Sequence, residues 1–385
     1  MIPKTRIYFD NAATTPMEKS VVEAMLPYLY EFHGNPSSIH SHGRETRNAI
    51  ERARKTIASL LNTSPSEILF TSSGTEADNT AIVGSVKSLG LKHIITSPIE
   101  HHAVLHTVEA LEKEGLVTVH LVENMPDGSI DFDSLEKLLV SFPNALVSIM
   151  HGNNEIGNIN DISRIGDLSR THGAVFHTDT VQTMGHFRFD LENMPLDFVV
   201  GSAHKFHGPK GIGFLYTNAR NQIQPFIHGG AQERNMRGGT ENVAGIVGMA
   251  KALELSLSHL DEHVTQIKAV KTYFIEKLKS TFSKVVFNGL SGDLDKSLPT
   301  VLNVAFPASD INDMLLFNLD IEKISVSGGS ACNSGATVTS HVLEHLKADP
   351  DGAHVRFSFS RFNALEEVDE TISQLKDLYP AFIKN

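Results

Sequence analysis

The sequence predicts an α/β protein with a large domain built on a mostly parallel β-sheet and a smaller α/β domain. Two observations lead to this prediction. Short apolar runs of strand length alternate with helical stretches in the first part of the chain, which is typical of parallel strands joined by helices. After about residue 240, one long helical region is followed by a mixture of short strands and helices.

The elements of the predicted large domain follow one another regularly. A helix at 44–61 carries Ala49, Ala53 and Ile57 on one face. A strand at 67–70 leads through a loop at 71–76 into the next helix. Because parallel sheets bind ligands at the carboxyl ends of their strands, the residues directly after each strand are the first candidates for a site. Further short apolar runs predict strands at 93–96, 117–121, 145–150, 174–177, 196–200 and 213–216.

The predicted small domain begins after a long helical connector. This connector covers 241–280 and has a break near 260–262. We therefore predict a large domain over residues 15–260, and a small domain formed by residues 1–14 together with 261–385. Strands of the small domain are predicted at 285–287, 300–306, 324–326 and 355–359, and helices at 311–319, 340–346 and 366–378.

The composition excludes several classes of protein. With 385 residues, 41% hydrophobic and 20% charged, the chain is long and apolar enough to bury a core. The net charge of −12 and the lack of a basic cluster argue against nucleic acid as a partner. No apolar run approaches the roughly 18 residues of a membrane span, and the first residues contain no signal region. We expect a cytoplasmic protein that binds no membrane.

Lys205 is the first candidate for chemistry. It lies in a turn between two predicted strands, with a glycine-rich return at 208–213. A lysine that forms an imine must be held rigidly and partly desolvated, so that its amine is available. The flanking Ser202 and His204 are candidates to bind a phosphate. The alternative is an ordinary surface turn, since the segment does not match the GxxxxGK[ST] nucleotide loop.

Residues after other predicted strands suit the same cofactor, pyridoxal phosphate. A carboxylate at Asp179 would pair with a protonated pyridine nitrogen and make the ring an electron sink. Gly74 and Thr75 open a helix, where backbone N–H groups favour an anion. Each residue alone is weak evidence, but one cofactor would use all of them. The other candidates are Gln182, which follows the same predicted strand as Asp179, Asn154, which would donate to the ring oxygen, and His101, which would stack on the ring face.

Ordered motifs along nearly the whole chain resemble the cysteine desulfurases of the iron–sulfur cluster assembly type. These are class V aminotransferases, in the aspartate-aminotransferase-like superfamily of pyridoxal-phosphate enzymes. The resemblance implies the fold of pyridoxal-phosphate-dependent transferases, fold type I. The matching segments are 8–16, 34–40, 70–79, 100–101, 150–157, 177–182, 202–213, 237–240, 330–332 and 355–358.

The resemblance also implies roles for the matching residues. Lys205 would hold the cofactor covalently and move the α-proton of the substrate, with His101 assisting. Arg356 would clamp the carboxylate of L-cysteine, near Asn154 and Asn35. Thr240 would reach the phosphate in the neighbouring subunit, which implies a homodimer. The cofactor-binding residues would be Gly74, Thr75, His101, Asn154, Asp179, Gln182, Ser202, His204, Lys205 and Thr240.

Cys332 is the one cysteine of the chain and matches the nucleophile of this family. Its thiolate would attack the substrate sulfur, leaving L-alanine and a persulfide on Cys332. The persulfide would then pass its sulfur to an acceptor protein, either a cluster scaffold or another sulfur carrier. A single cysteine excludes an internal disulfide and a relay to a second cysteine of the same chain.

Three alternatives compete with this interpretation. A selenocysteine lyase, another β-elimination enzyme or an aminotransferase would keep the cofactor, but an aminotransferase needs no thiol at Cys332. A non-catalytic binding partner is disfavoured because every expected catalytic group is present. The segment from His341 to His345 matches the HxxEH zinc pattern on a predicted helix, but five-residue matches arise by chance, and we expect no metal.

Overall fold

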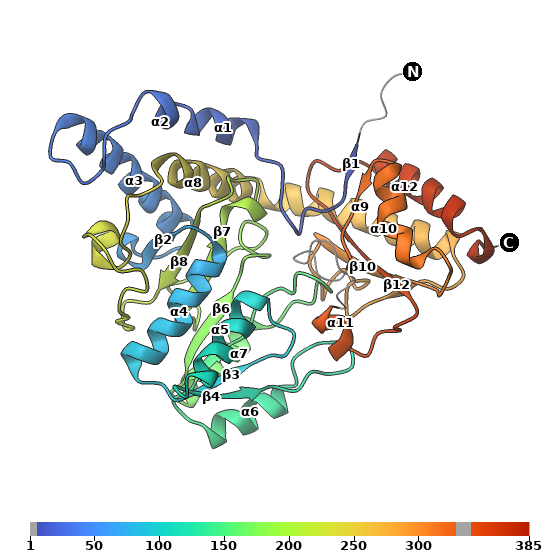
Figure 1. Cartoon of the computed structure of the whole chain (residues 1–385), viewed down its shortest axis with the longest axis horizontal. Helices are drawn as coiled ribbons and strands as arrows, with labels where there is room; N and C mark the ends of the chain where they lie inside the picture. Colours follow the sequence, from blue (N-terminus) through green and yellow to red (C-terminus); the bar gives the residue numbers. More distant parts are fainter. Residues whose placement is uncertain (1–5, 329–339, 385) are drawn as a thin grey trace.

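A central seven-stranded sheet organises the larger part of the computed structural model, which describes residues 6–328 and 340–384 (Figure 1). The strand order is β2-β8-β7-β6-β5-β3-β4. All neighbouring strands run parallel except β8, which is antiparallel to both β2 and β7. The prediction of a mostly parallel sheet is confirmed. The strands are β2 (Ile68–Thr71), β3 (His93–Thr96), β4 (Thr118–Leu121), β5 (Leu146–Ser148), β6 (Val175–Asp179), β7 (Phe198–Ser202) and β8 (Gly213–Thr217).

Helices cover both faces of this sheet. On one face, α4 (Gly74–Leu89) and α5 (His102–Lys113) bury apolar residues against β3, β5, β7 and β8. On the other face, four helices share one large apolar cluster with the sheet. Burial on both faces explains why the strands form continuous apolar runs in the sequence rather than alternating patterns. The four helices are α3 (Ser41–Leu60), α6 (Phe132–Ser141), α7 (Ile162–Thr171) and α8 (Val243–Ser258), and the short α1 (Lys19–Met25) and α2 (Pro27–Tyr30) precede them.

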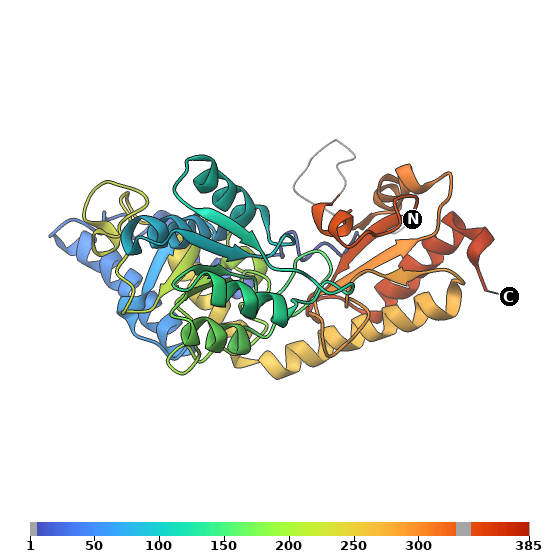
Figure 2. The ribbon, with the colours of Figure 1, turned by 90° about the horizontal axis from the view of Figure 1, so that it is seen from below.

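The smaller part contains an antiparallel sheet of order β12-β10-β9 and a separate parallel pair, β1 with β11. Its core is a second apolar cluster around Phe274, Phe306 and Tyr379. The long helix α9 extends beneath this part, as Figure 2 shows. Its elements are β1 (Ile7–Tyr8), α9 (Leu260–Thr281), β9 (Val286–Phe287), β10 (Val301–Phe306), α10 (Leu315–Ile321), β11 (Ile324–Ser325), α11 (His341–His345), β12 (Ala353–Ser358) and α12 (Leu365–Leu378).

The predicted elements match these with small shifts at their ends. The break in the helical connector falls at His259, where α8 and α9 meet at 76°. The helix predicted at 311–319 begins as a short 3-10 turn, Asn312–Met314, before α10. In the two described ranges, no single helix is long and apolar enough to cross a membrane. The proposed division at 14/15 and 260/261 stays a prediction.

Candidate active site

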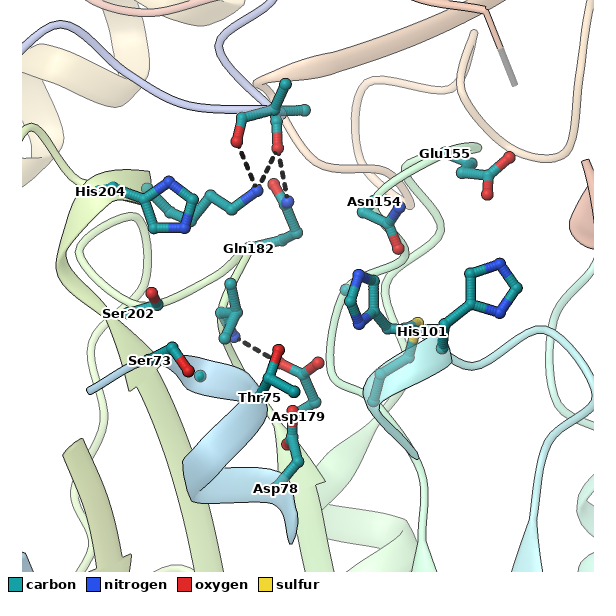
Figure 3. Close-up of a pocket in the computed structure, with 18 of the residues that line it drawn as sticks. Ser73, Thr75, Asp78, His101, Asn154, Glu155, Asp179, Gln182, Ser202 and His204 are labelled. Atoms are coloured by element: carbon teal, nitrogen blue, oxygen red, sulfur yellow. Dashed lines mark hydrogen bonds between the residues drawn. The ribbon is translucent and has the colours of Figure 1, made fainter. Parts of the chain in front are cut away.

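A cavity of about 280 Å³ lies where the carboxyl ends of β5, β6 and β7 meet the start of α4 (Figure 3). It receives residues from both parts of the chain, because Arg356 of β12 also lines it. Most residues predicted for the site are brought together here, although their roles remain predictions. Those that line the cavity are Gly74, Thr75, His101, Asn154, Asp179, Gln182, Ser202, His204, Lys205 and Arg356.

One end of the cavity is suited to an anion. Helix α4 begins there at Gly74, and the Oγ of Ser73 accepts a hydrogen bond from the N–H of Glu76 at 3.1 Å. A side chain at Gly74 would not fit, because an added Cβ would lie 2.7 Å from Cγ2 of Val181. The open N–H groups of this helix start and its dipole favour a phosphate. Ser202 lies on the same side of the cavity, as Figure 3 shows.

Lys205 reaches the cavity from a 3-10 turn, Ala203–Lys205, directly after β7. Its Nζ donates hydrogen bonds to the carbonyl oxygens of Ala12 at 2.5 Å and of Ala13 at 2.9 Å. Gln182 donates to the same Ala12 carbonyl at 3.0 Å. The N-terminal segment therefore folds over the lysine and holds its amine at the cavity wall.

Asp179 ends β6 and is buried. Its Oδ1 accepts a hydrogen bond from the N–H of Val181 at 2.8 Å. Burial raises the pKa of Asp179 to about 6, against the opposing effects of that N–H and of the charge of Lys205. A buried carboxyl group in this state suits a ligand that brings a protonated ring nitrogen.

His101 presents its ring to the cavity from the N-terminal cap of α5 (Figure 3). Its Nδ1 accepts a hydrogen bond from the N–H of Ala103 at 3.1 Å, which places the ring proton on Nε2. Burial, and then the positive charge of Lys205, lower the pKa of His101 to about 4. The ring is therefore neutral at pH 7 and holds a proton on Nε2.

Arg356 supplies the cation at the other end of the cavity. It is 1% exposed, and its Nη1 donates to the carbonyl oxygen of Asn154 at 3.0 Å. Its Nη2 donates to Oδ1 of Asp10 at 3.1 Å, whereas its Nε has no hydrogen-bond partner within residues 6–328 and 340–384. A guanidinium held in this way is suited to a carboxylate.

Two predicted site residues, Asn35 and Thr240, are not brought into this cavity. Asn35 is exposed, and its Oδ1 accepts from the N–H of Ser37 at 2.9 Å. Thr240 is exposed and borders a separate hollow that includes Arg237. Cys332 lies outside the described residues.

The zinc pattern lies on α11, beside the cavity. His341 forms a hydrogen bond through Nε2 with the carbonyl oxygen of Glu100 at 2.9 Å, and its ring centre lies 4.5 Å from that of His102. Among the described residues, no three His, Cys, Asp or Glu side chains could hold a metal ion together. The HxxEH pattern therefore has no third side chain, in the part of the chain that the structure describes, that could complete a metal site.

Comparison with known proteins gives the family. The sequence matches the family described as Aminotransferase class-V over residues 7–371. The chain belongs to the class V aminotransferases. Members of this family depend on pyridoxal phosphate, and the architecture of this class V aminotransferase is that of fold type I.

Several individual proteins are similar to this chain over almost its whole length. The chain is 43% identical to "Cysteine desulfurase IscS" of Dictyoglomus turgidum over 97% of this chain and 94% of the relative. A solved structure of a "NifS-like protein" superposes with a TM-score of 0.89 at 35% identity, covering 98% of this chain and 100% of the other. A structure described as "SspA in complex with cysteine" gives a TM-score of 0.79 at 34% identity, covering 94% and 100%.

Sequence reasoning missed several residues that line the cavity of this class V aminotransferase. Asp78 lies in the first turns of α4 with its carboxyl group near Asp179, and Glu155 follows Asn154. Burial, and then the charges of Asp179 and Glu100, raise the pKa of Asp78 well above its ordinary value. A detectable signal was present, because each is an acidic residue close to a residue that the sequence had already singled out.

Proposed function

We propose that this protein is a cysteine desulfurase, which converts L-cysteine to L-alanine with pyridoxal 5′-phosphate and transfers the sulfur to Cys332. The proposal rests on one observation above the others. Lys205, Asp179 and Arg356 line a single cavity, although they come from three separate parts of the chain. Relatives described as cysteine desulfurases at about 40% identity over nearly the whole chain support the same reaction.

The cavity fits the cofactor. Pyridoxal 5′-phosphate, when bound, supplies an aldehyde for attachment to Lys205 and a ring that withdraws electrons from the substrate. The start of α4 with Ser202 and His204 would hold the phosphate, because burial lowers the pKa of His204 to about 4 and leaves a neutral imidazole donor. Asp179 would pair with the ring nitrogen, and Gln182 and Asn154 would hold the ring oxygen. His101 would stack on the ring face.

Residues of the chain would also bind the substrate and move its protons. Arg356 would bind the carboxylate of L-cysteine, since a guanidinium binds carboxylates in pairs of hydrogen bonds. The amine of Lys205 would take the α-proton. The Nε2 proton of His101 would be available for transfer, because this histidine is neutral at pH 7.

The sulfur would then move to Cys332. Its thiolate forms an S–S bond with the substrate sulfur while the C–S bond breaks, and the electron pair of that bond stays on carbon. That carbon takes up a proton and becomes the methyl group of alanine, so the step needs no external oxidant. An acceptor protein, either a cluster scaffold or another sulfur carrier, would take the sulfur from the persulfide.

We further propose that the protein is a cytoplasmic homodimer. Thr240 would contribute to the phosphate site of the neighbouring subunit. The exposure of Thr240, which lies outside its own cavity, supports this arrangement. Exposed apolar side chains at Leu29, Tyr30 and Ile39 also suit a face that a second chain would cover.

The test is product analysis with L-cysteine and a thiol reductant. We expect equal amounts of alanine and sulfide from the wild type, and almost none from Cys332→Ala, although this variant should retain the yellow cofactor. Pyruvate in place of alanine would identify a β-elimination enzyme. An equally active Cys332→Ala would exclude Cys332 as the nucleophile and would contradict the proposal.

A further inference from the structure

Two carboxyl groups at the substrate end of the cavity hold the residues that flank the segment of Cys332. Ser327 precedes this segment and Ser340 follows it. Both serines are buried, with exposures of 8% and 3%. Each donates its hydroxyl hydrogen to a carboxylate, Ser327 to Asp10 at 2.6 Å and Ser340 to Glu155.

Glu155 is itself firmly held. It is 3% exposed, and its N–H donates to Oδ1 of Asn153 at 2.8 Å. Its carbonyl oxygen accepts from Nδ2 of Asn303 at 3.0 Å. Figure 3 shows Glu155 beyond Asn154, at the end of the cavity opposite Ser73. The carboxylate that meets Ser340 is therefore a fixed point of the cavity wall.

Ser340 connects Glu155 to the start of helix α11. Its Oγ also accepts a hydrogen bond from the N–H of Leu343 at 3.2 Å, so the same hydroxyl caps α11. Val342 and Leu343 of this helix pack in a small apolar cluster with Ile99 and Ile156. The start of α11 is thus anchored both by apolar packing and by Glu155.

Arg356 is close to both of these anchors, the Asp10–Ser327 and Glu155–Ser340 hydrogen bonds. Oδ1 of Asp10, which accepts from Ser327, also accepts from Nη2 of Arg356 at 3.1 Å. The backbones of Ser327 and Arg356 form two hydrogen bonds, of 3.3 and 2.8 Å. Burial raises the pKa of Glu155 to about 7, whereas the hydroxyl of Ser340 and the charge of Arg356 lower it. Both anchors are therefore placed relative to the guanidinium proposed to bind the substrate carboxylate.

We infer that Glu155 is a positioning residue for sulfur transfer, which acts on Cys332 through its hydrogen bond with Ser340. Asp10 performs the matching task at Ser327. Together, Asp10 and Glu155 fix Ser327 and Ser340, the described residues that precede and follow this part of the sequence, relative to Arg356. This inference rests on the proposed desulfurase activity and adds a residue to which the comparisons assign no role.

The consequence concerns one step of the reaction. Misplacing a reacting group by about 1 Å slows a reaction by about a hundredfold. Glu155 is not proposed to touch the cofactor, so its loss should spare cofactor binding. The attack of Cys332 on the substrate sulfur should slow, while the binding of L-cysteine at Arg356 should not weaken.

The experiment uses the holoenzyme and single-turnover conditions. Glu155→Ala, Ser340→Ala and the double variant are mixed with L-cysteine. The change in cofactor absorbance reports substrate binding, and mass spectrometry of Cys332 reports the persulfide. We expect each single variant to form the persulfide at least about tenfold more slowly, with an unchanged half-saturating concentration of L-cysteine and an unchanged absorbance step. The double variant should be no slower than the slower single variant, because both remove the same bond.

Conservative variants and a control complete the design. Glu155→Gln keeps an acceptor oxygen and Ser340→Thr keeps the hydroxyl, so both should recover most of the rate. Glu344→Gln alters an exposed carboxylate on the same helix and should match the wild type. If Glu155→Ala does not fold, Ser340→Ala with Ser340→Thr as its rescue decides the question.

Distinct results would overturn the inference. Persulfide formation at the wild-type rate in Ser340→Ala would show that the anchor is not needed. A slow Glu155→Gln beside a normal Ser340→Ala would make Glu155 an acid or base rather than a positioning residue. A wild type that desulfurates L-cysteine while these variants behave normally defeats only the inference. A wild type that forms no persulfide defeats the proposed function.

Discussion

Burial controls the charge of individual residues in the cavity. It lowers the pKa of His101 and of His204 to about 4, and it raises that of Asp179 to about 6 and of Glu155 to about 7. The histidines are therefore neutral donors and acceptors at pH 7. The carboxyl groups are partly destabilised as anions, which prepares them for cationic or hydrogen-bonding partners.

Asp179→Asn should stabilise the cofactor-free protein while weakening cofactor binding. The pKa of Asp179 in the folded protein exceeds its ordinary value of 3.8, so the folded state binds this proton more tightly than the unfolded state. The free energy of unfolding therefore falls as the pH rises from about 4 to about 6, and stays lower above that. At pH 8 the variant should gain on the order of 2 kcal/mol in urea denaturation without cofactor.

The same variant has an internal control in its pH dependence. The gain in stability should shrink as the pH is lowered toward 5, because the wild-type carboxyl group then becomes protonated. Cofactor affinity, measured by absorbance after dialysis, should fall because the neutral amide of the variant cannot pair as an anion with the ring nitrogen. An equal stability of the two proteins at pH 8 would contradict the assignment of a destabilised carboxylate.

At the scale of elements, the starts and junctions of helices place the functional groups. Helix α4 brings its first turn to the carboxyl end of β7, and α5 begins with His101 as its cap. The loop before α8 stabilises the fold instead, because Glu233 in this loop binds Arg54 of α3. Two local changes test these separate tasks.

Gly74→Ala should lower cofactor affinity, because the added Cβ would lie 2.7 Å from Val181 at the start of α4. Gly90 at the other end of the same helix is the matched control. It has φ +69° with open space around it, so Gly90→Ala should cost about 1 kcal/mol of stability while leaving cofactor affinity unchanged. Fluorescence titration of the cofactor and urea denaturation measure the two effects. Equal affinity in both variants would contradict the role given to this helix start.

Glu233→Ala should destabilise the fold strongly. Its carboxylate accepts from Nη1 and Nη2 of Arg54 on α3 at 2.8 and 2.7 Å, and from the N–H of Phe70 at 2.9 Å. Removing one partner of a buried ion pair costs about 3–5 kcal/mol. Arg188→Ala breaks the exposed pair with Asp261 and should cost less than about 1 kcal/mol. If both variants lost a similar free energy of unfolding in urea denaturation, the buried pair would not be more stabilising than the exposed pair.

At the scale of the whole molecule, the cavity forms where the two parts of the chain meet. Arg356 comes from the sheet of the smaller part, whereas Asp179 ends a strand of the central sheet and Lys205 follows the next one. Ala12 and Ala13, near the beginning of the chain, accept the hydrogen bonds of Lys205. The site therefore depends on the relative placement of both parts.

The proposed dimer gives a prediction at this scale. Light scattering of the holoenzyme should give the mass of two 42.1 kDa chains. Thr240→Val should lower cofactor affinity even though Thr240 lies outside the cavity of its own chain, because the hydroxyl would serve the neighbouring phosphate. Ser141→Ala, an exposed change elsewhere on the surface, should have no effect. The mass of a single chain would contradict the proposal.

The order of the elements and most of the candidate chemistry could be predicted from local patterns in the sequence. Short apolar runs alternating with helical stretches predicted the strands, and the residues after those strands, such as Asp179 and Asn154, do line the cavity. Local patterns suffice for this because periodicity and strand ends are properties of neighbouring residues. The ordered motifs also indicated the family to which the chain belongs.

Which side chains meet could be learned only from the folded chain. Ala12 contacts Lys205 and Asp10 contacts Arg356 across large separations in sequence, and no local pattern encodes such contacts. The bond between Glu155 and Ser340 was equally invisible, because it depends on how α11 docks beside the turn after β5. The raised pKa of Asp179 follows from the same cause: burial is set by the packing of the whole chain, and only that packing removes the carboxyl group from water.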